Sequence, residues 1–289
     1  MIKQMTVIGV GLIGGSLARA LKQQGYCREI VGCGRDSVHL QRAIALGVID
    51  RFSTDVGDAV AGADMIVVAV PLGAMESCFR AMIGHLATDA VITDVGSAKC
   101  CVVDAARAAF GVLPPGFVPG HPIAGTEKSG VEASFAELYQ QRRVIITPVA
   151  ESAPEAIAKV RIMWQQAGAL VDEMGVEHHD EVLAATSHLP HLLAFNLVNT
   201  LLSMDESEEI FRFAAGGFRD FTRIASSDPV MWRDVALANR DAILTVMDRY
   251  SAALKQMRDS VEKSDGEALK RAFMRAKAAR DRFKDQIEN

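Results

Sequence analysis

The first sixteen residues constrain the fold of this chain more than any other stretch. Residues 2–8 are an apolar, β-branched run, which is typical of a buried strand. The run leads directly into a GxGxxG pattern at residues 9–14, and a helical pattern follows from Leu17. The pattern is weak alone, but between a strand and a helix it predicts a Rossmann-type dinucleotide-binding unit. The alternative is an ordinary strand–helix turn.

The three glycines of the GxGxxG segment are expected to have different structural roles. Gly9 permits a tight turn after the strand, Gly11 lets the backbone approach a pyrophosphate, and Gly14 lets the helix pack close to the strand. The start of the helix offers free N–H groups and the positive end of its dipole to phosphates. The cofactor-binding residues expected here are Gly9, Gly11, Leu12, Ile13 and Gly14.

The end of the second predicted strand, residues 29–33, bears on which nucleotide is bound. In NAD sites an acid near this position hydrogen-bonds the ribose 2′-hydroxyl. Here the position is Gly34, and the next residue is Arg35, whose guanidinium suits a 2′-phosphate. These residues predict NADP as the cofactor. The alternative takes Asp36 as the ribose acid and Arg35 as a solvated charge, and NAD is then possible.

The alternation of strands and helices continues through the first half of the chain. Further strands are predicted at 65–70, 90–95, 143–147 and 170–171, with a helix at about 153–167. Ligands of open α/β sheets bind outside the carboxyl ends of the strands, so Pro71, Ser97 and residues 120–130 should share one rim. We expect a doubly wound sheet in a nucleotide-binding domain of residues 1–172, with Pro71 and Ser97 beside the cofactor.

Residues 120–130, GHPIAGTEKSG, concentrate polar groups and glycines. Glycine and proline break helices and strands, so a loop is predicted here. Such a loop can wrap a small ligand and present His121 to it. The alternative is a tight turn that is merely rich in glycine and proline.

After about residue 173 the strand-like runs stop. Residues 184–203 predict one long apolar helix, capped by Thr186 or Ser187 with Pro190 in its first turn. Further helices are expected at about 207–216, 229–240, 241–263 and 265–287. We therefore expect an all-helical second domain, residues 173–289, with its apolar surface covered in a homodimer.

Four histidines at the start of this helical half raise the question of a metal site. Adjacent His178 and His179 cannot easily reach one ion, and no HExxH-type arrangement is present, so we expect no metal. His188 and His191 are three residues apart and so are neighbours on a helix. We expect one of this pair to pack or form hydrogen bonds, and the other to face the cleft.

Residues 216–233 form a second dense polar segment. Arg219, Arg223 and Arg233 supply fixed positive charge that suits bidentate binding of carboxylates. Trp232 can form the wall of a ring-sized pocket. The alternative is three ordinary surface arginines around a connecting turn.

The composition fits a folded globular chain and excludes two classes of protein. Of the 289 residues, 49% are hydrophobic and 23% are charged, which is ample for a core. A formal net charge of −5 gives no broad basic field to attract nucleic acid. No apolar stretch of about 18 residues or more and no signal-peptide pattern is present, so no membrane span is expected. The five cysteines show no zinc spacing and no CxxC pair, which predicts reduced thiols in a cytoplasmic protein.

Taken together, five segments resemble the prephenate/arogenate (cyclohexadienyl) dehydrogenases of tyrosine biosynthesis. They are GVGLIGGS at 9–16, DVGSAK at 94–99, GHPIAGTEKSG at 120–130, TSHLPH at 186–191 and GFRDFTRIA at 217–225. The third and fifth are specific to that family. The resemblance implies a dinucleotide domain, a helical dimerisation domain and an active site between them. It implies NAD(P)-dependent oxidative decarboxylation of prephenate to 4-hydroxyphenylpyruvate, or of arogenate to tyrosine.

The resemblance also implies roles for individual residues. His121 matches the catalytic histidine that hydrogen-bonds the substrate ring hydroxyl, and Ser97 matches the serine that contacts this hydroxyl and the nicotinamide side. Arg223 matches the arginine that binds a substrate carboxylate. The remaining matches to pocket positions are His188, His191, Glu127 and Trp232. Gly34 and Arg35 depart from the NAD-using relatives, which carry an acid, and resemble the NADP-using members.

Two other readings stay open. One is another two-domain NAD(P)-dependent enzyme, such as an imine reductase or a 3-hydroxyacid dehydrogenase. The other is a non-catalytic NADP(H)-sensing protein, which would need the glycine segment but not His121, Ser97 and Arg223 together. The choice between prephenate and arogenate is also open, because no single residue identified here decides it.

Overall fold

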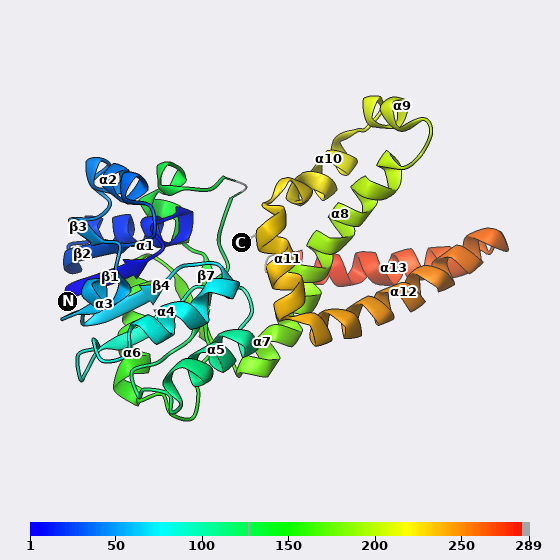
Figure 1. The fold of residues 1–289 in the computed structure, drawn as a ribbon. Coiled ribbons are helices and arrows are strands. Elements are labelled where there is room, and N and C mark those ends of the chain that lie inside the picture. Colours follow the sequence, from blue (N-terminus) through cyan, green and yellow to red (C-terminus); the bar gives the residue numbers. More distant parts are fainter. Residues whose placement is uncertain (127, 285–289) are drawn as a thin grey trace. The chain divides into compact units, whose positions relative to one another are not determined.

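The computed structural model describes residues 1–126 and 128–284. Contacts divide the chain into two compact units, Met1–Asn239 and Arg240–Asn289, which are described separately. The first unit contains two sheets and most of the helices (Figure 1). The second is a pair of long helices.

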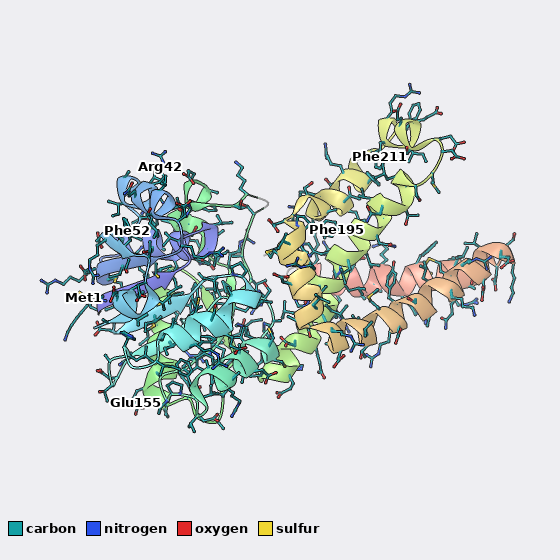
Figure 2. The ribbon with its side chains drawn as sticks, viewed as in Figure 1. Met1, Arg42, Phe52, Glu155, Phe195 and Phe211 are labelled. Atoms are coloured by element: carbon teal, nitrogen blue, oxygen red, sulfur yellow. The ribbon has the colours of Figure 1, made fainter. Side chains whose placement is uncertain are left out.

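The first unit begins with a five-stranded, all-parallel sheet in the order β3-β2-β1-β4-β5. Its strands are β1 (Ile2–Ile8), β2 (Cys27–Cys33), β3 (Arg51–Ser53), β4 (Met65–Val68) and β5 (Val91–Asp94). The connections contain α1 (Leu12–Gln23), α2 (Ser37–Ala45), α3 (Val56–Val60), the 3-10 turn η1 (Leu72–Ala74), α4 (Met75–Ala81) and, after β5, α5 (Cys100–Phe110). Every residue of β4 and β5 is buried, as the unbroken apolar run of β4 predicts for that strand. Phe52 of β3 and Arg42 of α2 are labelled near the sheet edge in Figure 2.

A second sheet corrects the prediction of one doubly wound sheet. It contains β6 (Gly120–Pro122), β7 (Arg143–Ile146) and β8 (Leu170–Glu173) in that order, and β6 runs antiparallel to β7. Between them lie η2 (Val131–Ala133), η3 (Ala136–Tyr139) and α6 (Pro154–Gln166). The loop predicted for 120–130 therefore begins as a strand. Pro122 is compatible with this because β6 is an edge strand, where a missing N–H is tolerated.

The core lies on both faces of the five-stranded sheet. One cluster includes Trp164 and Tyr139, whose rings meet edge to face with centroids 5.1 Å apart. The other includes Phe79 and Phe117, which meet in the same manner at 5.7 Å. All five cysteines are free thiols, two of them buried and three half-buried. Burial raises the pKa of Cys33 to about 11, so its thiol is protonated at neutral pH.

The rest of the first unit is helical, as predicted, but two helix boundaries were wrong. The elements are α7 (Val176–Leu183), the π turn η4 (Ala184–His188), α8 (Leu189–Leu202), α9 (Ser207–Arg212), α10 (Gly216–Thr222), η5 (Arg223–Ser226) and α11 (Pro229–Ala238). The helix predicted for 207–216 ends at Arg212, and α10 begins at the glycine pair. Phe211 of α9, labelled in Figure 2, contacts Phe218 of α10, and their ring centroids are 5.9 Å apart.

The helix predicted for 184–203 does not start at a cap. Thr186 and Ser187 lie inside a π turn that joins α7 to α8, and Thr186 Oγ1 donates to the carbonyl of Val182 one turn earlier. Pro190 has no N–H for the preceding turn, and its ring crowds that turn, so the wider π geometry accommodates it. This turn carries His188.

The second unit consists of α12 (Arg240–Glu262) and α13 (Gly266–Arg282), which pack against each other. A groove of about 640 Å³ between them is lined by residues that include Met257 and Leu269. On α12, exposed apolar side chains recur every three or four residues, at Met247, Tyr250, Leu254, Met257 and Val261. No helix in the described part of the chain combines the length and apolar character needed to cross a membrane.

The turn between β1 and α1 has the close approaches that the glycine pattern predicts. Gly9 has φ +94°, and a Cβ there would lie 2.3 Å from the carbonyl oxygen of Ala69. A Cβ on Gly14 would lie 2.5 Å from the Gly9 oxygen and 2.7 Å from Val7. Gly11 is different, because no described residue other than its chain neighbours lies within 4 Å of a Cβ built on it. The backbone at Gly11 is therefore open on its outer side.

These contacts predict that two alanine substitutions differ in their effect on stability. Gly14→Ala should lower the free energy of unfolding by about 1–3 kcal/mol, because the methyl group overlaps backbone atoms that cannot move aside. Gly11→Ala should stay within about 1 kcal/mol of the unsubstituted protein, because its methyl group meets open space. Urea unfolding of the two variants measures the difference. Equal stabilities would contradict this account of the turn.

Candidate active site

The start of α1 is suited to hold phosphate groups. Gly11 is its N-cap and supplies no side-chain acceptor, and the first turn contains no acidic residue. The N–H groups at this end, including those of Leu12 and Ile13, thus have no side-chain cap. Together with the open side of Gly11, they form a cradle that fits the pyrophosphate of a dinucleotide.

The residues after β2 lie where a cofactor ribose would bind. Gly34 follows the strand directly, and Arg35 is exposed. Asp36 is the N-cap of α2, and its carboxylate accepts hydrogen bonds from the N–H groups of Val38 (2.8 Å) and His39 (3.3 Å). The only acid of this segment is therefore already engaged in capping a helix.

The ends of the central strands meet at one edge, as predicted. The N–H of Ala69 donates to the carbonyl of Ile8 (2.7 Å), and the N–H of Val95 donates to the carbonyl of Val68 (3.2 Å). The segments that follow β1, β4 and β5 are therefore neighbours. Pro71 is exposed at this edge just before η1, and Ser97 is half-buried in the loop after β5.

A buried ion pair connects this edge to β6. The Lys99 ammonium pairs with the Asp94 carboxylate, and both side chains are fully buried. Lys99 Nζ also donates to the Gly120 carbonyl (2.7 Å), and Asp94 accepts the Gly120 N–H (3.1 Å) and the Gly96 N–H (2.7 Å). Both backbone polar groups of Gly120, the residue before His121, are thus fixed. Asp94 and Lys99 were not predicted as individual site residues, although the DVGSAK motif contains both.

His121 is buried and forms a hydrogen bond to a second histidine. Its Nδ1 lies 2.9 Å from Nε2 of His179, and Nδ1 of His179 lies 2.8 Å from the Asp180 carboxylate. His179 and Asp180 belong to α7. The Asp180 carboxylate also accepts the backbone N–H groups of Lys99 (2.7 Å) and Cys100 (2.9 Å). From the sequence, His179 was considered only as a metal ligand. The sequence feature that could have indicated this hydrogen-bonded chain is an Asp directly after a His on a helix.

Electrostatics keep His121 neutral. Burial, together with the neighbouring His179, Lys99 and His188, holds the pKa of His121 well below its usual value. For Asp180, burial acts to raise the pKa, but hydrogen bonds from His179 and from two backbone N–H groups outweigh it and hold the pKa below its usual value. A neutral imidazole and an ionised carboxylate therefore face the two sides of His179.

His188 is buried on the π turn and presents the opposite ring nitrogen. The Asn239 amide nitrogen donates to Nδ1 of His188 (3.0 Å) and to the Asp180 carbonyl (2.8 Å). An amide NH2 group only donates, so Nδ1 carries the lone pair and Nε2 carries the hydrogen. Burial lowers the pKa of His188 to about 4. Within the described residues, neither this Nε2–H nor the indole N–H of Trp232 has a well-aligned hydrogen-bond partner, although the Ser97 backbone interacts with the His188 ring and acts to raise its pKa.

The rings of His191 and Trp232 stack, with centroids 3.6 Å apart and planes 20° apart. His191 Nδ1 donates to the Ser187 carbonyl (2.9 Å), and burial lowers the pKa of His191. Trp232 lies on α11, which packs against η1 after β4. The structure thus groups His188, His191 and Trp232, and it matches the packed, hydrogen-bonding role expected for one histidine of the pair.

The arginines of residues 216–233 lie on different elements. Arg223 begins η5, which packs against α8, the helix that carries His191. Arg219 lies 3.6 Å from Asp220 and Arg233 lies 2.6 Å from Asp234, and both arginine side chains are largely exposed. Their positions fit the alternative of surface arginines.

Two remaining expectations concern Glu127 and metal binding. Glu127 lies outside the described residues. Within residues 1–126 and 128–284, no group of three or more His, Cys, Asp or Glu side chains is arranged to hold a metal ion. His178 is exposed and lies 3.8 Å from Glu181 on the same helix.

Comparisons with known proteins identify the family. A model described as "Prephenate dehydrogenase, nucleotide-binding domain" matches residues 17–173, and "Prephenate dehydrogenase, dimerization domain" matches residues 175–275. The cyclohexadienyl dehydrogenase of Zymomonas mobilis is 40% identical, over 96% of this chain and 95% of the relative. The prephenate dehydrogenase of Bacillus subtilis is 39% identical, over 94% of this chain and 74% of the relative.

Solved structures agree over nearly the whole chain. Prephenate dehydrogenase from A. aeolicus in complex with hydroxyphenyl propionate and NAD+ has a TM-score of 0.91 and 34% identity, covering 98% of this chain and 99% of that one. Synechocystis arogenate dehydrogenase has a TM-score of 0.82 and 25% identity, covering 97% and 99%. This chain, with a nucleotide-binding fold followed by a helical dimerisation domain, therefore belongs to the prephenate dehydrogenase family.

Proposed function

We propose that this protein catalyses the oxidative decarboxylation of prephenate, arogenate or both, in tyrosine biosynthesis. The products are 4-hydroxyphenylpyruvate and tyrosine respectively, with CO2 and a reduced pyridine nucleotide. The observation that carries this proposal is a buried, neutral His121 attached to the sheet edge where the nucleotide cradle lies. Membership of the prephenate dehydrogenase family supports it.

The cofactor would be held by the β1–α1 turn and the adjacent strand ends. Gly9 and Gly14 shape the turn, while Gly11 and the N–H groups of Leu12 and Ile13 would receive the pyrophosphate. Pro71 and Ser97, at the ends of β4 and β5, would line the nicotinamide side. When bound, the pyridine nucleotide accepts the hydride that the substrate ring carbon releases.

We infer that NADP is preferred to NAD. Gly34 stands where an acid would bind the ribose 2′-hydroxyl, and the Arg35 guanidinium beside it suits a 2′-phosphate. Asp36, the other acid considered for the ribose, is engaged with the N–H groups of α2. Both of these bonds use Oδ1 of Asp36, and they hold its carboxylate at the start of α2.

The chemistry requires a base at the ring hydroxyl and holders for the carboxylates. A neutral His121 can accept the hydroxyl proton, and Ser97 would hydrogen-bond the same oxygen. As the hydroxyl oxygen becomes a carbonyl, the ring carboxylate leaves as CO2 and the ring becomes aromatic. The protein therefore mainly orients the ring and holds its substituents.

Substrate anions would bind among donors of the helical part. Arg223 is the proposed carboxylate ligand, and it begins η5, which packs against the helix α8 that carries His191. The buried N–H groups of His188 and Trp232 support this proposal, because neither has a well-aligned acceptor among the described residues and an unpaired buried donor is costly. A carboxylate or keto oxygen of the substrate would satisfy them.

We further propose a cytoplasmic homodimer. The match to a dimerisation domain and the apolar stripe on α12 support a second copy as the covering surface. Five free thiols fit a reducing compartment. The predicted division into residues 1–172 and 173–289 stays a prediction.

Replacing the base should affect turnover and spare cofactor binding. His121→Asn should lower kcat by about 10²–10⁴-fold, because the hydroxyl proton loses its acceptor. Its affinity for the nucleotide, measured by fluorescence titration, should stay within about twofold. The control is His85→Asn, an exposed histidine outside the site, which should keep full activity. Unchanged turnover in His121→Asn would refute the assignment.

A two-by-two assay of prephenate or arogenate with NAD or NADP tests substrate and cofactor together. We expect NADP to be preferred, and Arg35→Ala should raise the KM for NADP by about tenfold while changing that for NAD little. The matched control is Arg28→Ala, an exposed arginine on β2. A strong NAD preference in the unsubstituted protein would assign the ribose to Asp36 instead.

Arg223 should act on substrate affinity. Arg223→Ala should raise the KM for the diene substrate by about 10–100-fold with a smaller change in kcat, because a charge-assisted hydrogen bond is lost. Arg219→Ala, one turn earlier and paired with its neighbour Asp220, is the control and should leave KM unchanged. Equal KM values in both variants would remove Arg223 from the site.

A further inference from the structure

The side chains of Asp180, His179 and His121 form a continuous hydrogen-bonded chain. Its two links measure 2.8 Å and 2.9 Å. We propose that Asp180 and His179 are positioning residues that hold His121 in the tautomer whose Nε2 carries the lone pair. This proposal deepens the proposed function and rests on it, because it concerns the base of the same reaction.

Asp180 acts only as a hydrogen-bond acceptor in this hydrogen-bonded chain. One of its oxygens accepts the Lys99 N–H (2.7 Å) and the other accepts the Cys100 N–H (2.9 Å), at the positive end of α5. These bonds favour the ionised carboxylate, which has no hydrogen to donate. Nδ1 of His179 must therefore carry the hydrogen in the bond between them.

The protonation state of the other ring nitrogen of His179, Nε2, follows from its burial. Its ring is fully buried, and burial lowers its pKa despite the opposing effect of Asp180. A neutral imidazole with a hydrogen on Nδ1 has a lone pair on Nε2. That lone pair faces Nδ1 of His121 at 2.9 Å, so His121 must donate from Nδ1.

The edge of the His121 ring that points away from His179 carries Nε2. With its hydrogen on Nδ1, neutral His121 has a lone pair on Nε2, on the edge of the ring away from His179. A proton acceptor on this edge is what the reaction needs. In the other tautomer Nε2 would carry a hydrogen, and the ring could not take the hydroxyl proton there.

The proton balance of the step is simple. The substrate O–H bond breaks and an N–H bond forms at Nε2 of His121, which becomes an imidazolium ion. This cation donates from Nδ1 to His179, which in turn donates to the ionised Asp180. The other charged or titratable groups that act on His121 and His179 are Lys99, Asp94 and His188. Asp180 thus supplies a negative charge that stabilises the cation through His179.

The neighbouring His188 gives an internal contrast. Asn239 donates to Nδ1 of His188 and also to the backbone carbonyl of Asp180. His188 must therefore have the opposite tautomer, with its hydrogen on Nε2. The same short segment of α7 thus connects a proton acceptor, His121, with a hydrogen-bond donor, His188.

Nitrogen NMR of the full chain tests the tautomers without any assay of activity. The protein contains seven histidines, and single substitutions can assign their ring signals after ¹⁵N-histidine labelling. At neutral pH we expect His121 and His179 to be protonated at Nδ1 and His188 at Nε2. His121 protonated at Nε2 would overturn the proposal, whether or not the protein turns over either substrate.

Kinetics test whether the chain acts on the reaction. Asp180→Asn can donate to His179 and so reverse both hydrogen bonds, which leaves a hydrogen on Nε2 of His121. We expect kcat to fall by about 10²–10⁴-fold while the KM values for nucleotide and substrate change less than about threefold. The acid limb of the kcat–pH profile should also move to lower pH, because the imidazolium loses its carboxylate.

Two further variants separate positioning from folding. His179→Gln offers an amide oxygen that can still accept from His121, so it should retain more than about a tenth of the activity, whereas His179→Leu should resemble Asp180→Asn. His178→Gln, the exposed neighbour, should be unchanged. A wild-type kcat and pH profile in Asp180→Asn, or equal losses in His179→Gln and His179→Leu, would overturn the proposal. Absence of turnover in the unsubstituted protein would instead refute the proposed function.

Discussion

The arrangement of this site depends on one buried ion pair. Two opposite charges without solvent exposure are unfavourable unless every hydrogen-bonding position is used. Here Asp94 accepts from the N–H groups of Gly96 and Gly120, while Lys99 donates to the Gly120 carbonyl. Because Asp94 ends β5 and Gly120 begins β6, the pair joins the two sheets. His121 is the next residue, so the ion pair determines where the proposed base can lie.

The loop between β5 and α5 transmits this constraint to the helical part. Ser97, Lys99 and Cys100 follow one another within four residues, yet they contact different parts of the site. Ser97 lies at the nucleotide edge, and the Lys99 side chain holds Gly120. The backbone N–H groups of Lys99 and Cys100 hold Asp180 on α7. A single short loop therefore sets both the backbone of His121 and the far end of its hydrogen-bonded chain.

The sequence predicted the features that depend on neighbouring residues. The glycine turn, the parallel strands and the helical second half follow from local pattern. What it missed depends on contacts between distant segments. His179 lies 58 residues from His121, and Asn239 lies 51 residues from His188, so no spacing indicates these bonds. The strand β6 is three residues long and contains glycine and proline, and its pairing with β7 overrides both.

The π turn was missed for a different reason. A proline near the start of an apolar run usually marks the first turn of a helix. Here Pro190 instead follows α7, a helix that packs against α5 and continues into α8 through the widened π turn. The widened turn carries His188, whose Nδ1 meets Asn239. Departures from regular helical geometry are common at functional sites, and this one positions a proposed substrate donor.

The burial that keeps His121 neutral also makes it a poor base. Desolvation and the nearby positive charge of Lys99 disfavour the imidazolium ion, so the free enzyme keeps a ready lone pair at neutral pH. Desolvation and the Lys99 charge also oppose the proton transfer to His121 that the reaction requires. An ionised Asp180, acting through His179, favours the charged ring only once the proton arrives. Stabilisation that appears as charge develops lowers the barrier without strengthening the ground state. A buried site thus needs both groups: His121 is neutral before the proton transfer, and Asp180 stabilises its charge afterwards.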